Sequence, residues 1–339
     1  MYCKIHEVFL ITLLPKNRVK MVISLKHKFS ICLLLILMLS FKADKKEVAK
    51  KNIISEKAFN ELFPLRDKFY TYSAFINAVN AMANLKIKIE MRGDWIYKIT
   101  RTDKRNNNPI VVRQDQDWET IWAKEKPYKY IDVDYADFCN AKDLKTNRKE
   151  LAAVFAHVAH ETRNGIDKKF NDGLMLIDEL APTSAYISPN VIYPAADGKK
   201  YYGRGPIQLS YNGNYGFASD CIFGDERVLL NNPDLVSNNA ILAFETAIYF
   251  WMTPQSAKPS AHDVMVGNWQ PTQEEQSKGF KPGFGMTINI VNGYAECNKS
   301  ENQKAMQDRI GFYQYFLNKF NISDANCACS CGAMQPYAN

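Results

Sequence analysis

The sequence of 339 residues predicts a mainly α-helical domain. Apolar residues recur at helical spacing in three long segments, and start or stop signals bound each of them. In the first segment, Asn147 and Glu150 form a capping-box pattern at the start, and Gly165 follows the end. The other two segments span about 239–253 and 303–320.

Two shorter helices are expected before these segments, followed by a region that is rich in aromatics. Residues 55–82 carry apolar residues at helical spacing in two runs. Residues 85–145 break the helical pattern with a polar, Asn-rich stretch and with dense aromatics, which include Trp95, Tyr97, Trp118, Trp122, Tyr128, Tyr130 and Tyr135.

The N-terminus is expected to be a signal peptide over residues 1–43. Lys26 and Lys28 precede an apolar run of about eleven residues, which is too short to span a bilayer and typical of an export signal. Ala43 is the expected cleavage position, and Met21 is an alternative start. The alternative interpretation is an uncleaved N-terminal anchor.

The charge of the chain lies mainly in this leader. The whole chain holds 43 Lys/Arg and 36 Asp/Glu, a formal net charge of +7. Residues 1–51 hold 11 Lys/Arg against 3 Asp/Glu, which leaves 32 against 33 in the rest. We therefore expect no nucleic-acid partner. After cleavage, we expect a secreted monomer, extracellular or periplasmic, without stable membrane association.

The most informative motif is Tyr201–Ser210. Its two glycines allow a tight turn, and the alternation after Pro206 predicts a strand that directs Gln208 and Ser210 to one face. Glu161 and Glu179 lie upstream and could face that pair. Two carboxylates and a hydroxyl that can hold a water are the groups of an inverting glycoside hydrolase. The Gly-x-Gly pattern lacks the βαβ context of a nucleotide site and no metal motif occurs, so no cofactor is expected.

An ordered set of motifs resembles glycoside hydrolase family 19, the lysozyme-like and mostly α-helical chitinases typified by plant endochitinases. The matching segments cover most of residues 55–327 and are Phe69–Tyr72, Ala156–Thr162, Lys199–Ser210, Asn231–Val236, Phe250–Gln255, Pro282–Gly285 and Arg309–Tyr313. The resemblance implies a bilobal helical domain over 56–327 with a small β or loop element lining the cleft. Residues 44–55 would be a linker and 328–339 a C-terminal tail.

The resemblance implies roles for three polar residues. Glu161 would be the general acid, because a carboxyl at an apolar helix end can remain protonated; an ordinary surface ion pair is the alternative. Glu179 would be the general base, with Asp178 as the competing candidate. Ser210 would help Glu179 hold the attacking water, or else satisfy only backbone groups.

Further residues match substrate-binding and structural positions of the family. Positions that hydrogen-bond N-acetylglucosamine units are matched by Gln208, Asn214, Lys258 and Asn292, and Tyr193 stands where a sugar-contacting Trp is usual. Arg309 falls on the buried side of its helix, where an unpaired charge is costly. The resemblance therefore implies a network in which Glu296 and Arg309 reach Glu161. Arg163 departs from the family pattern close to the acid.

Residues 85–145 are expected to be an insertion, since plant-type members connect the flanking helices with far fewer residues. The aromatics predict either a platform that extends the sugar-binding cleft or a satellite subdomain with its own core. We favour the satellite.

The eight cysteines do not predict a zinc site, because the histidines stand at no ligand spacing from the cluster Cys327, Cys329 and Cys331. Disulfides or free thiols are expected instead. The resemblance pairs Cys297 with Cys327 in a bridge that ties down the C-terminus.

The resemblance implies an endochitinase that hydrolyses β-1,4 linkages between N-acetylglucosamine units with inversion. Two alternatives remain. A peptidoglycan-cleaving muramidase or endolysin-like hydrolase would meet the same sugar in alternation, and a catalytically weak chitin-binding protein would keep only the cleft. The presence of both glutamates and of Ser210 argues against the last alternative.

Overall fold

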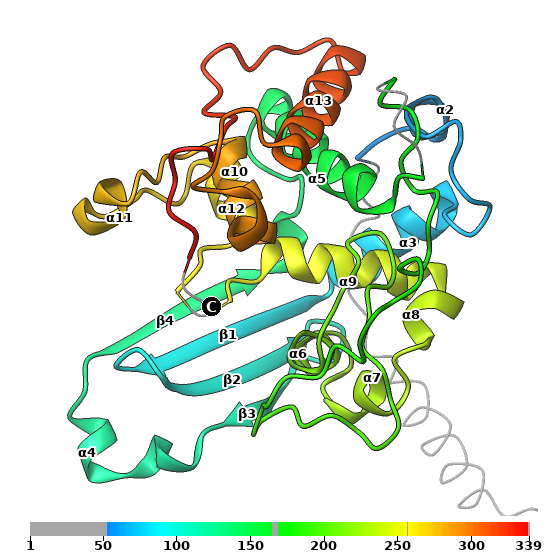
Figure 1. Cartoon of the computed structure of the whole chain (residues 1–339). Helices are drawn as coiled ribbons and strands as arrows, with labels where there is room; N and C mark the ends of the chain where they lie inside the picture. The colour runs from blue at the N-terminus through cyan, green and yellow to red at the C-terminus, as the bar shows by residue number, and fades with distance from the viewer. Residues whose placement is uncertain (1–52, 165–168, 256, 338–339) are drawn as a thin grey trace, which may run out of the picture. The chain divides into compact units, whose positions relative to one another are not determined.

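Helices form the framework of the computed structural model, which describes residues 53–164, 169–255 and 257–337. Helix α5 packs against α13, and α3 packs against α9 (Figure 1). The helices are α2 (Glu56–Leu62), α3 (Tyr72–Met82), α4 (Ile121–Lys124), α5 (Leu144–Thr162), α6 (Asn212–Phe223), α7 (Arg227–Asn231), α8 (Leu235–Asn238), α9 (Ala240–Met252), α10 (Ala261–Val266), α11 (Gln273–Ser277), α12 (Phe284–Glu296) and α13 (Lys304–Lys319).

The predicted helices over 55–82, 239–253 and 303–320 are confirmed. The capping box predicted from Asn147 and Glu150 is wrong. Helix α5 begins earlier, where the carboxylate of Asp143 accepts the backbone N–H of Thr146 at 2.8 Å. Glu150 is fully buried and accepts hydrogen bonds from side chains of α9 and α10. The predicted signal peptide and the stop at Gly165 lie outside the described residues.

An aromatic cluster joins α2, α3, α5 and α13. The rings of Phe59, Phe63, Phe75 and Phe316 surround Phe155 of α5, with centroid separations of 5.0 to 6.2 Å. All five side chains are buried, and edge and tilted contacts of this kind stabilise a core beyond the area they bury. The cluster fixes the helix whose last turn carries Glu161.

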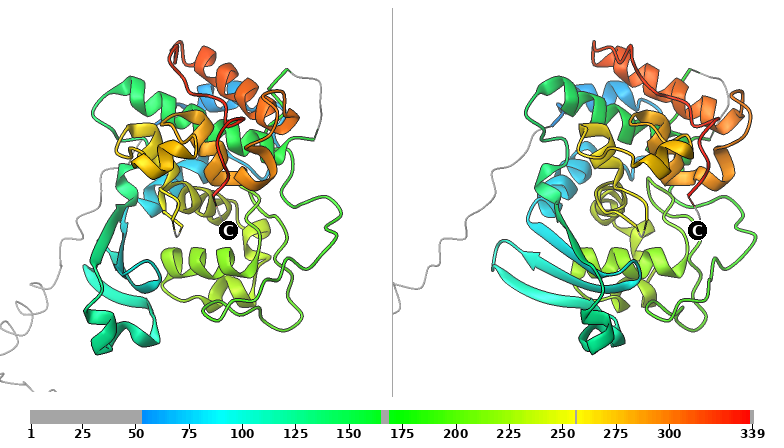
Figure 2. Two further views of the ribbon diagram at one scale, coloured as in Figure 1. Left: turned by 60° about the vertical axis from the view of Figure 1, so that its left-hand side comes forward. Right: turned by 90° about the vertical axis from the view of Figure 1, so that its left-hand side faces the viewer.

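The region between α3 and α5 forms a four-stranded antiparallel sheet with the order β3-β2-β1-β4. Its strands are β1 (Leu85–Arg92), β2 (Ile96–Asp103), β3 (Asn108–Gln114) and β4 (Tyr128–Asp134). Figure 2 shows the sheet beside α6, which contacts β1 and β3. Alternate residues of β1 are buried, as expected for a sheet with one face against the core.

The sheet is not a satellite with a core of its own. Its buried residues, including Leu85, Ile87 and Ile99, belong to the main hydrophobic core. A small separate cluster joins only Ile96, Trp118 and Ala123. The favoured interpretation of this region is therefore wrong for most of the sheet.

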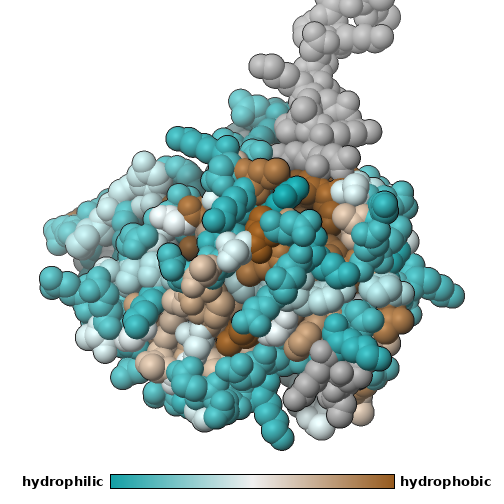
Figure 3. Space-filling view, turned by 90° about the horizontal axis from the view of Figure 1, so that it is seen from above, coloured by the Kyte–Doolittle hydropathy of each residue, from teal (hydrophilic) through white to brown (hydrophobic). Residues whose placement is uncertain are grey.

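Polar side chains dominate the face of the molecule seen in Figure 3, around a hydrophobic patch near its centre. Isolated exposed apolar residues are normal on folded proteins. Within the described ranges, no helix combines the length and the apolar character needed to cross a membrane.

The C-terminal disulfide differs from the prediction. Cys297 pairs with Cys331, with 5.0 Å between their Cα atoms, and Cys327 pairs with Cys329. The physical reason is the path of the last segment: the N–H of Asn298 donates to the carbonyl of Cys331 at 3.2 Å, which brings Cys331 rather than Cys327 beside Cys297.

Replacing Cys331 with Ser is expected to lower the free energy of unfolding by about 2–4 kcal/mol, because the bridge closes a long loop. Cys327→Ser is the matched control and should have little effect, since its bridge spans only two positions. Urea titrations would measure both. A large loss for Cys327→Ser alone would restore the pairing of Cys297 with Cys327.

One buried carboxylate in α6 makes stability depend on pH. Asp220 is 1% exposed, accepts a hydrogen bond from the hydroxyl of Tyr193 at 2.8 Å, and burial raises its pKa to about 7. The unfolded chain loses this proton near the ordinary value of 3.8, whereas the folded chain keeps it up to about pH 7. Stability therefore falls as pH rises through this window and changes no further above it.

Asp220→Asn is expected to make the fall in stability between pH 4 and pH 7 shallower, by as much as about 1.4 kcal/mol per pH unit. Urea unfolding at several pH values would measure it. Asp225→Asn is the control, because Asp225 is only half-buried and its pKa is lowered by the hydrogen bond from Arg227. If the slope of Asp220→Asn matched that of the wild type, Asp220 would be ionised throughout.

Candidate active site

The structure brings the two predicted carboxylates to one cleft. Glu161, Glu179 and Ser210 all line a cavity of about 940 Å³. The predicted substrate-binding residues Gln208, Asn214, Lys258 and Asn292 line the same cavity. Its walls come from the last turn of α5, the loop before Tyr201, the start of α6, the segment after α9, and α12.

The Tyr201–Ser210 motif forms a tight turn and not the predicted strand. Arg204 and Leu209 exchange both backbone hydrogen bonds, at 2.9 and 3.3 Å, and the residues between them form the turn. Gly205 has a φ of +71°, and a Cβ there would approach Val236 Cγ1 to 3.0 Å. Leu209 is buried and Ser210 is half-buried, and both line the cleft.

Glu179 is held at both carboxylate oxygens. Its Oε1 accepts the hydroxyl of Tyr186 at 2.5 Å, and its Oε2 accepts the N–H of Gly203 at 3.2 Å. The hydrogen bond to Glu179 raises the pKa of Tyr186 to about 12, so this phenol remains a donor at neutral pH. The competing acid, Asp178, does not line the cleft and accepts the hydroxyl of Ser237 instead.

Glu161 lies at the end of an ionic network. Its Oε1 accepts a hydrogen bond from Arg309 Nη2 at 2.5 Å. Arg309 has no exposed surface and also donates to both oxygens of Glu296, at 2.9 to 3.1 Å. Asn292 in turn donates to Glu296 Oε1 at 2.9 Å. The surroundings of Glu161 are therefore more polar than the apolar helix end that the sequence suggested.

His157 completes the network one turn before Glu161. Arg309 Nη1 can only donate, so His157 Nδ1 accepts at 3.1 Å, and Nε2–H must donate to Thr287 Oγ1 at 2.8 Å. Burial and the nearby charge of Arg309 hold the pKa of His157 well below its ordinary value, so the ring is neutral. Burial alone would lower the pKa of Arg309, but the carboxylates of Glu161 and Glu296 raise it.

A second set of ion pairs orders the chain after the acid. Arg163, which departs from the family pattern, bonds to Asp172 at 3.0 Å and to Asp308. His160 bonds to the other oxygen of Asp308 at 2.7 Å. Thr162 accepts the N–H of Leu174 at 2.7 Å. These contacts direct the charge of Arg163 to carboxylates other than Glu161.

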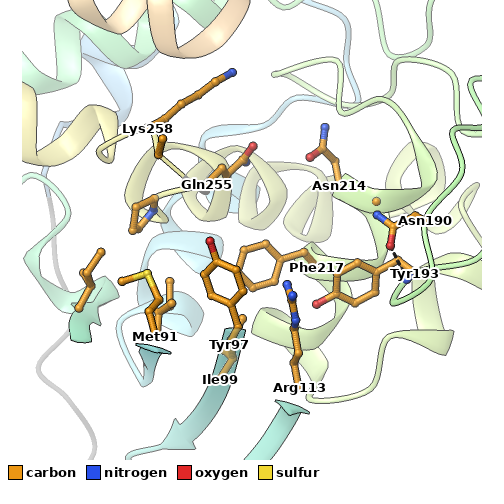
Figure 4. Close-up of a pocket in the computed structure, with 15 residues that line it drawn as sticks. Met91, Tyr97, Ile99, Arg113, Asn190, Tyr193, Asn214, Phe217, Gln255 and Lys258 are labelled. Atoms are coloured by element: carbon orange, nitrogen blue, oxygen red, sulfur yellow. Dashed lines mark hydrogen bonds between the residues drawn. The ribbon is translucent and has the colours of Figure 1, made fainter. Parts of the chain in front are cut away.

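The remaining predicted residues divide into two groups. Gln208 and Asn214 bond to backbone carbonyls of the turn and still line the cleft. Tyr193 does not line it, because its ring is buried and its hydroxyl is bonded to Asp220; Tyr193 lines a neighbouring cavity instead. That cavity, of about 520 Å³, is shown in Figure 4.

Tyr186 and Gln255 are among the cleft residues that sequence reasoning missed. Tyr186, the partner of Glu179, lies in an irregular loop whose sequence gives no periodic signal. Gln255 lines both cavities and ends the matched segment Phe250–Gln255, so its place after α9 could have indicated it.

The model of glycoside hydrolase family 19, described as chitinase class I, matches residues 126–329, more than half of the chain. The chain belongs to this family. The fold of this chain is therefore lysozyme-like and mainly helical, as predicted.

Relatives in plants share part of this chain. An endochitinase of Brassica napus is 46% identical over 193 residues, which are 56% of this chain and 59% of that protein. An inactive chitinase-like protein of Hevea brasiliensis is 44% identical over 189 residues, 55% of this chain and 59% of that protein. The family 19 chain therefore spans less than two thirds of the length of these relatives.

Bacterial structures extend the likeness to most of the chain. A bacterial family 19 chitinase of known crystal structure is 28% identical to this chain, with a TM-score of 0.54. The superposition covers 83% of this chain and 100% of the bacterial chain. Chitinase C of Streptomyces griseus is 26% identical with a TM-score of 0.55, covering 82% and 97%.

Arg309→Ala is expected to lower the free energy of unfolding by about 3–5 kcal/mol, because it leaves Glu296 buried without its cation. Chemical denaturation would measure the change. Lys304→Ala, at an exposed cation of the same helix, is the control and should change stability little. Equal stabilities of the two variants would contradict the network.

Proposed function

We propose that this chain is an endochitinase that hydrolyses β-1,4 linkages between N-acetylglucosamine units with inversion. The observation that carries the proposal is the presence of Glu161 and Glu179 in the walls of one cleft, within a family 19 fold. The carboxylates differ in their surroundings, since an arginine fixes one and neutral donors fix the other. Different environments suit two carboxyl groups with different roles.

In the proposed mechanism, Glu161 is the general acid. The proton of its carboxyl passes to the glycosidic oxygen as the bond from that oxygen to the anomeric carbon breaks. Arg309 donates three hydrogen bonds to Glu296. Its Nη2 also donates to Glu161, so the two carboxylates share this nitrogen. Arg309 therefore orients the acid, and it also stabilises the carboxylate that the acid becomes.

Glu179 acts as the general base in this proposal. It takes a proton from a water while the water oxygen bonds to the anomeric carbon from the opposite face. Tyr186 and the N–H of Gly203 fix the carboxylate. Ser210 donates its hydroxyl proton to the carbonyl of Gln208 at 2.9 Å, so its oxygen can accept a hydrogen bond from that water.

Four side chains would bind the sugars. Gln208, Asn214 and Asn292 present amides at the cleft, which suit the amide of an N-acetyl group, and Lys258 supplies a cation. Burial lowers the pKa of Lys258, and within the described part of the chain no carboxylate pairs with its ammonium, so its hydrogen bonds are available to a ligand.

We also propose that residues 1–43 direct export and that the mature protein acts outside the cytoplasm as a monomer. The charged start and short apolar run of the leader support export.

Purified protein with chitin oligosaccharides and with peptidoglycan would test the function. We expect the wild type to cleave the chitin oligosaccharides, and Glu161→Gln to lose more than about a hundredfold in rate while it still binds them. NMR of fresh product should show the α-anomer, because the water attacks from the far face. Tyr128→Ala, outside the cleft, is the activity control.

Other outcomes would identify the alternatives. Cleavage of peptidoglycan alone would indicate a muramidase-like enzyme, and binding without turnover would indicate a chitin-binding protein. A β-anomer as the first product would overturn the assignment of Glu179 as a base.

A further inference from the structure

The sheet forms one wall of a second cavity that adjoins the catalytic cleft. This sheet-lined pocket, of about 520 Å³, is lined by residues of all four strands, including Met91, Tyr97, Arg113 and Ile131. It shares five lining residues with the cleft, namely Asn190, Gly213, Asn214, Gln255 and Lys258. The two spaces therefore adjoin along these residues.

The sheet-lined pocket combines aromatic rings with hydrogen-bond donors. Figure 4 shows Tyr97 and Arg113 rising from neighbouring strands toward Asn214 and Gln255, with Phe217 of α6 at the back. The guanidinium of Arg113 lies 4.7 Å from the centre of the Tyr97 ring and bonds to Asp115 at 2.9 Å. These contacts hold Tyr97 and Arg113 in place before any ligand binds.

Two donors in the pocket have no protein partner among the residues that the structure describes. Gln255 Nε2 is buried, and among the described residues no acceptor bonds to it. A buried donor without an acceptor costs about 1–3 kcal/mol, so a ligand carbonyl or hydroxyl at this point would restore a lost interaction. Lys258, which also has no carboxylate partner in the described ranges, lies at the same boundary.

A further cavity adjoins the sheet-lined pocket. A third cavity, of about 480 Å³, shares Met91, Ile131, Pro254, Ala257 and Lys258 with it. Tyr130 and Trp269 line this third space. A series of adjoining spaces with aromatic rings and polar donors fits an extended polymer better than a single small molecule.

We propose that the sheet-lined pocket is an additional saccharide subsite, which binds sugar units of the chitin chain beyond those held in the catalytic cleft. The proposal rests on the chitinase function proposed above. Strands β1, β2 and β3 precede the residues matched by the family model, so most of this wall lies outside the matched region. The sugar faces would pack on Tyr97 and Phe217, and Gln255 and Arg113 would donate to their oxygens.

The test compares short and long chitin oligosaccharides. For Tyr97→Ala we expect kcat/KM on the hexamer to fall about tenfold, which corresponds to about 1.4 kcal/mol, with the value on the shortest cleaved oligomer unchanged. Tyr97→Phe keeps the ring and should retain the wild-type ratio between the two substrates. Trp95→Ala, at an exposed ring in the turn between β1 and β2 and outside the pocket, is the control and should also retain this ratio.

The outcomes separate the subsite from the proposed function. An equal fall on both substrates, or no fall on the hexamer, would overturn the subsite while turnover by the wild type still supports the chitinase. If the wild type cleaved neither substrate, the chitinase would fail, and calorimetric titration with the hexamer would decide the subsite. In that case, equal affinities of wild type and Tyr97→Ala would overturn the subsite too. If Tyr97→Ala fails to fold, the same comparison of the hexamer with the shortest cleaved oligomer can be made with Arg113→Gln.

Discussion

The buried positive charge of Arg309 is the constraint on which the site depends. A guanidinium without exposed surface needs carboxylates beside it, and here α12 supplies Glu296 while α5 supplies Glu161. The same group requires His157 to be an acceptor, which fixes its tautomer and directs its other nitrogen to Thr287 of α12. One side chain of α13 thus sets the positions of two other helices, and Glu161 is placed as a consequence.

Much of this arrangement could be predicted from the sequence. Helical periodicity located α2, α3, α9 and α13, because each buries one face. We expected Arg309 to need an acidic partner because it lies on a buried helix face. Glu296 is that partner, and both of its carboxylate oxygens accept hydrogen bonds from Arg309. The roles of Glu161, Glu179 and Ser210 stay predictions, although the fold brings all three to one cavity.

The errors arise where tertiary contacts outweigh local pattern. The alternation after Pro206 also suits a turn closed by Arg204 and Leu209, and only packing against Val236 and its neighbours decides between turn and strand. Tyr193 became a core residue because Asp220 lies within reach of its hydroxyl. The sheet was not predicted, although β1 alternates apolar and charged residues as a half-buried strand does.

The ends of the sheet segment lie next to each other in space. At the start of β1, Lys86 pairs with Asp134 at the end of β4, so the chain leaves the helical framework and returns to it at one place. Segments with neighbouring ends can change in length with little disturbance to the surrounding fold, most easily at exposed hairpin tips. Under the proposed function, the sheet would lengthen the binding groove, whereas Glu161 and Glu179 lie on other stretches of the chain. Changes in the length of the sheet segment would then alter how much polymer the protein could hold while Glu161 and Glu179 stay unchanged.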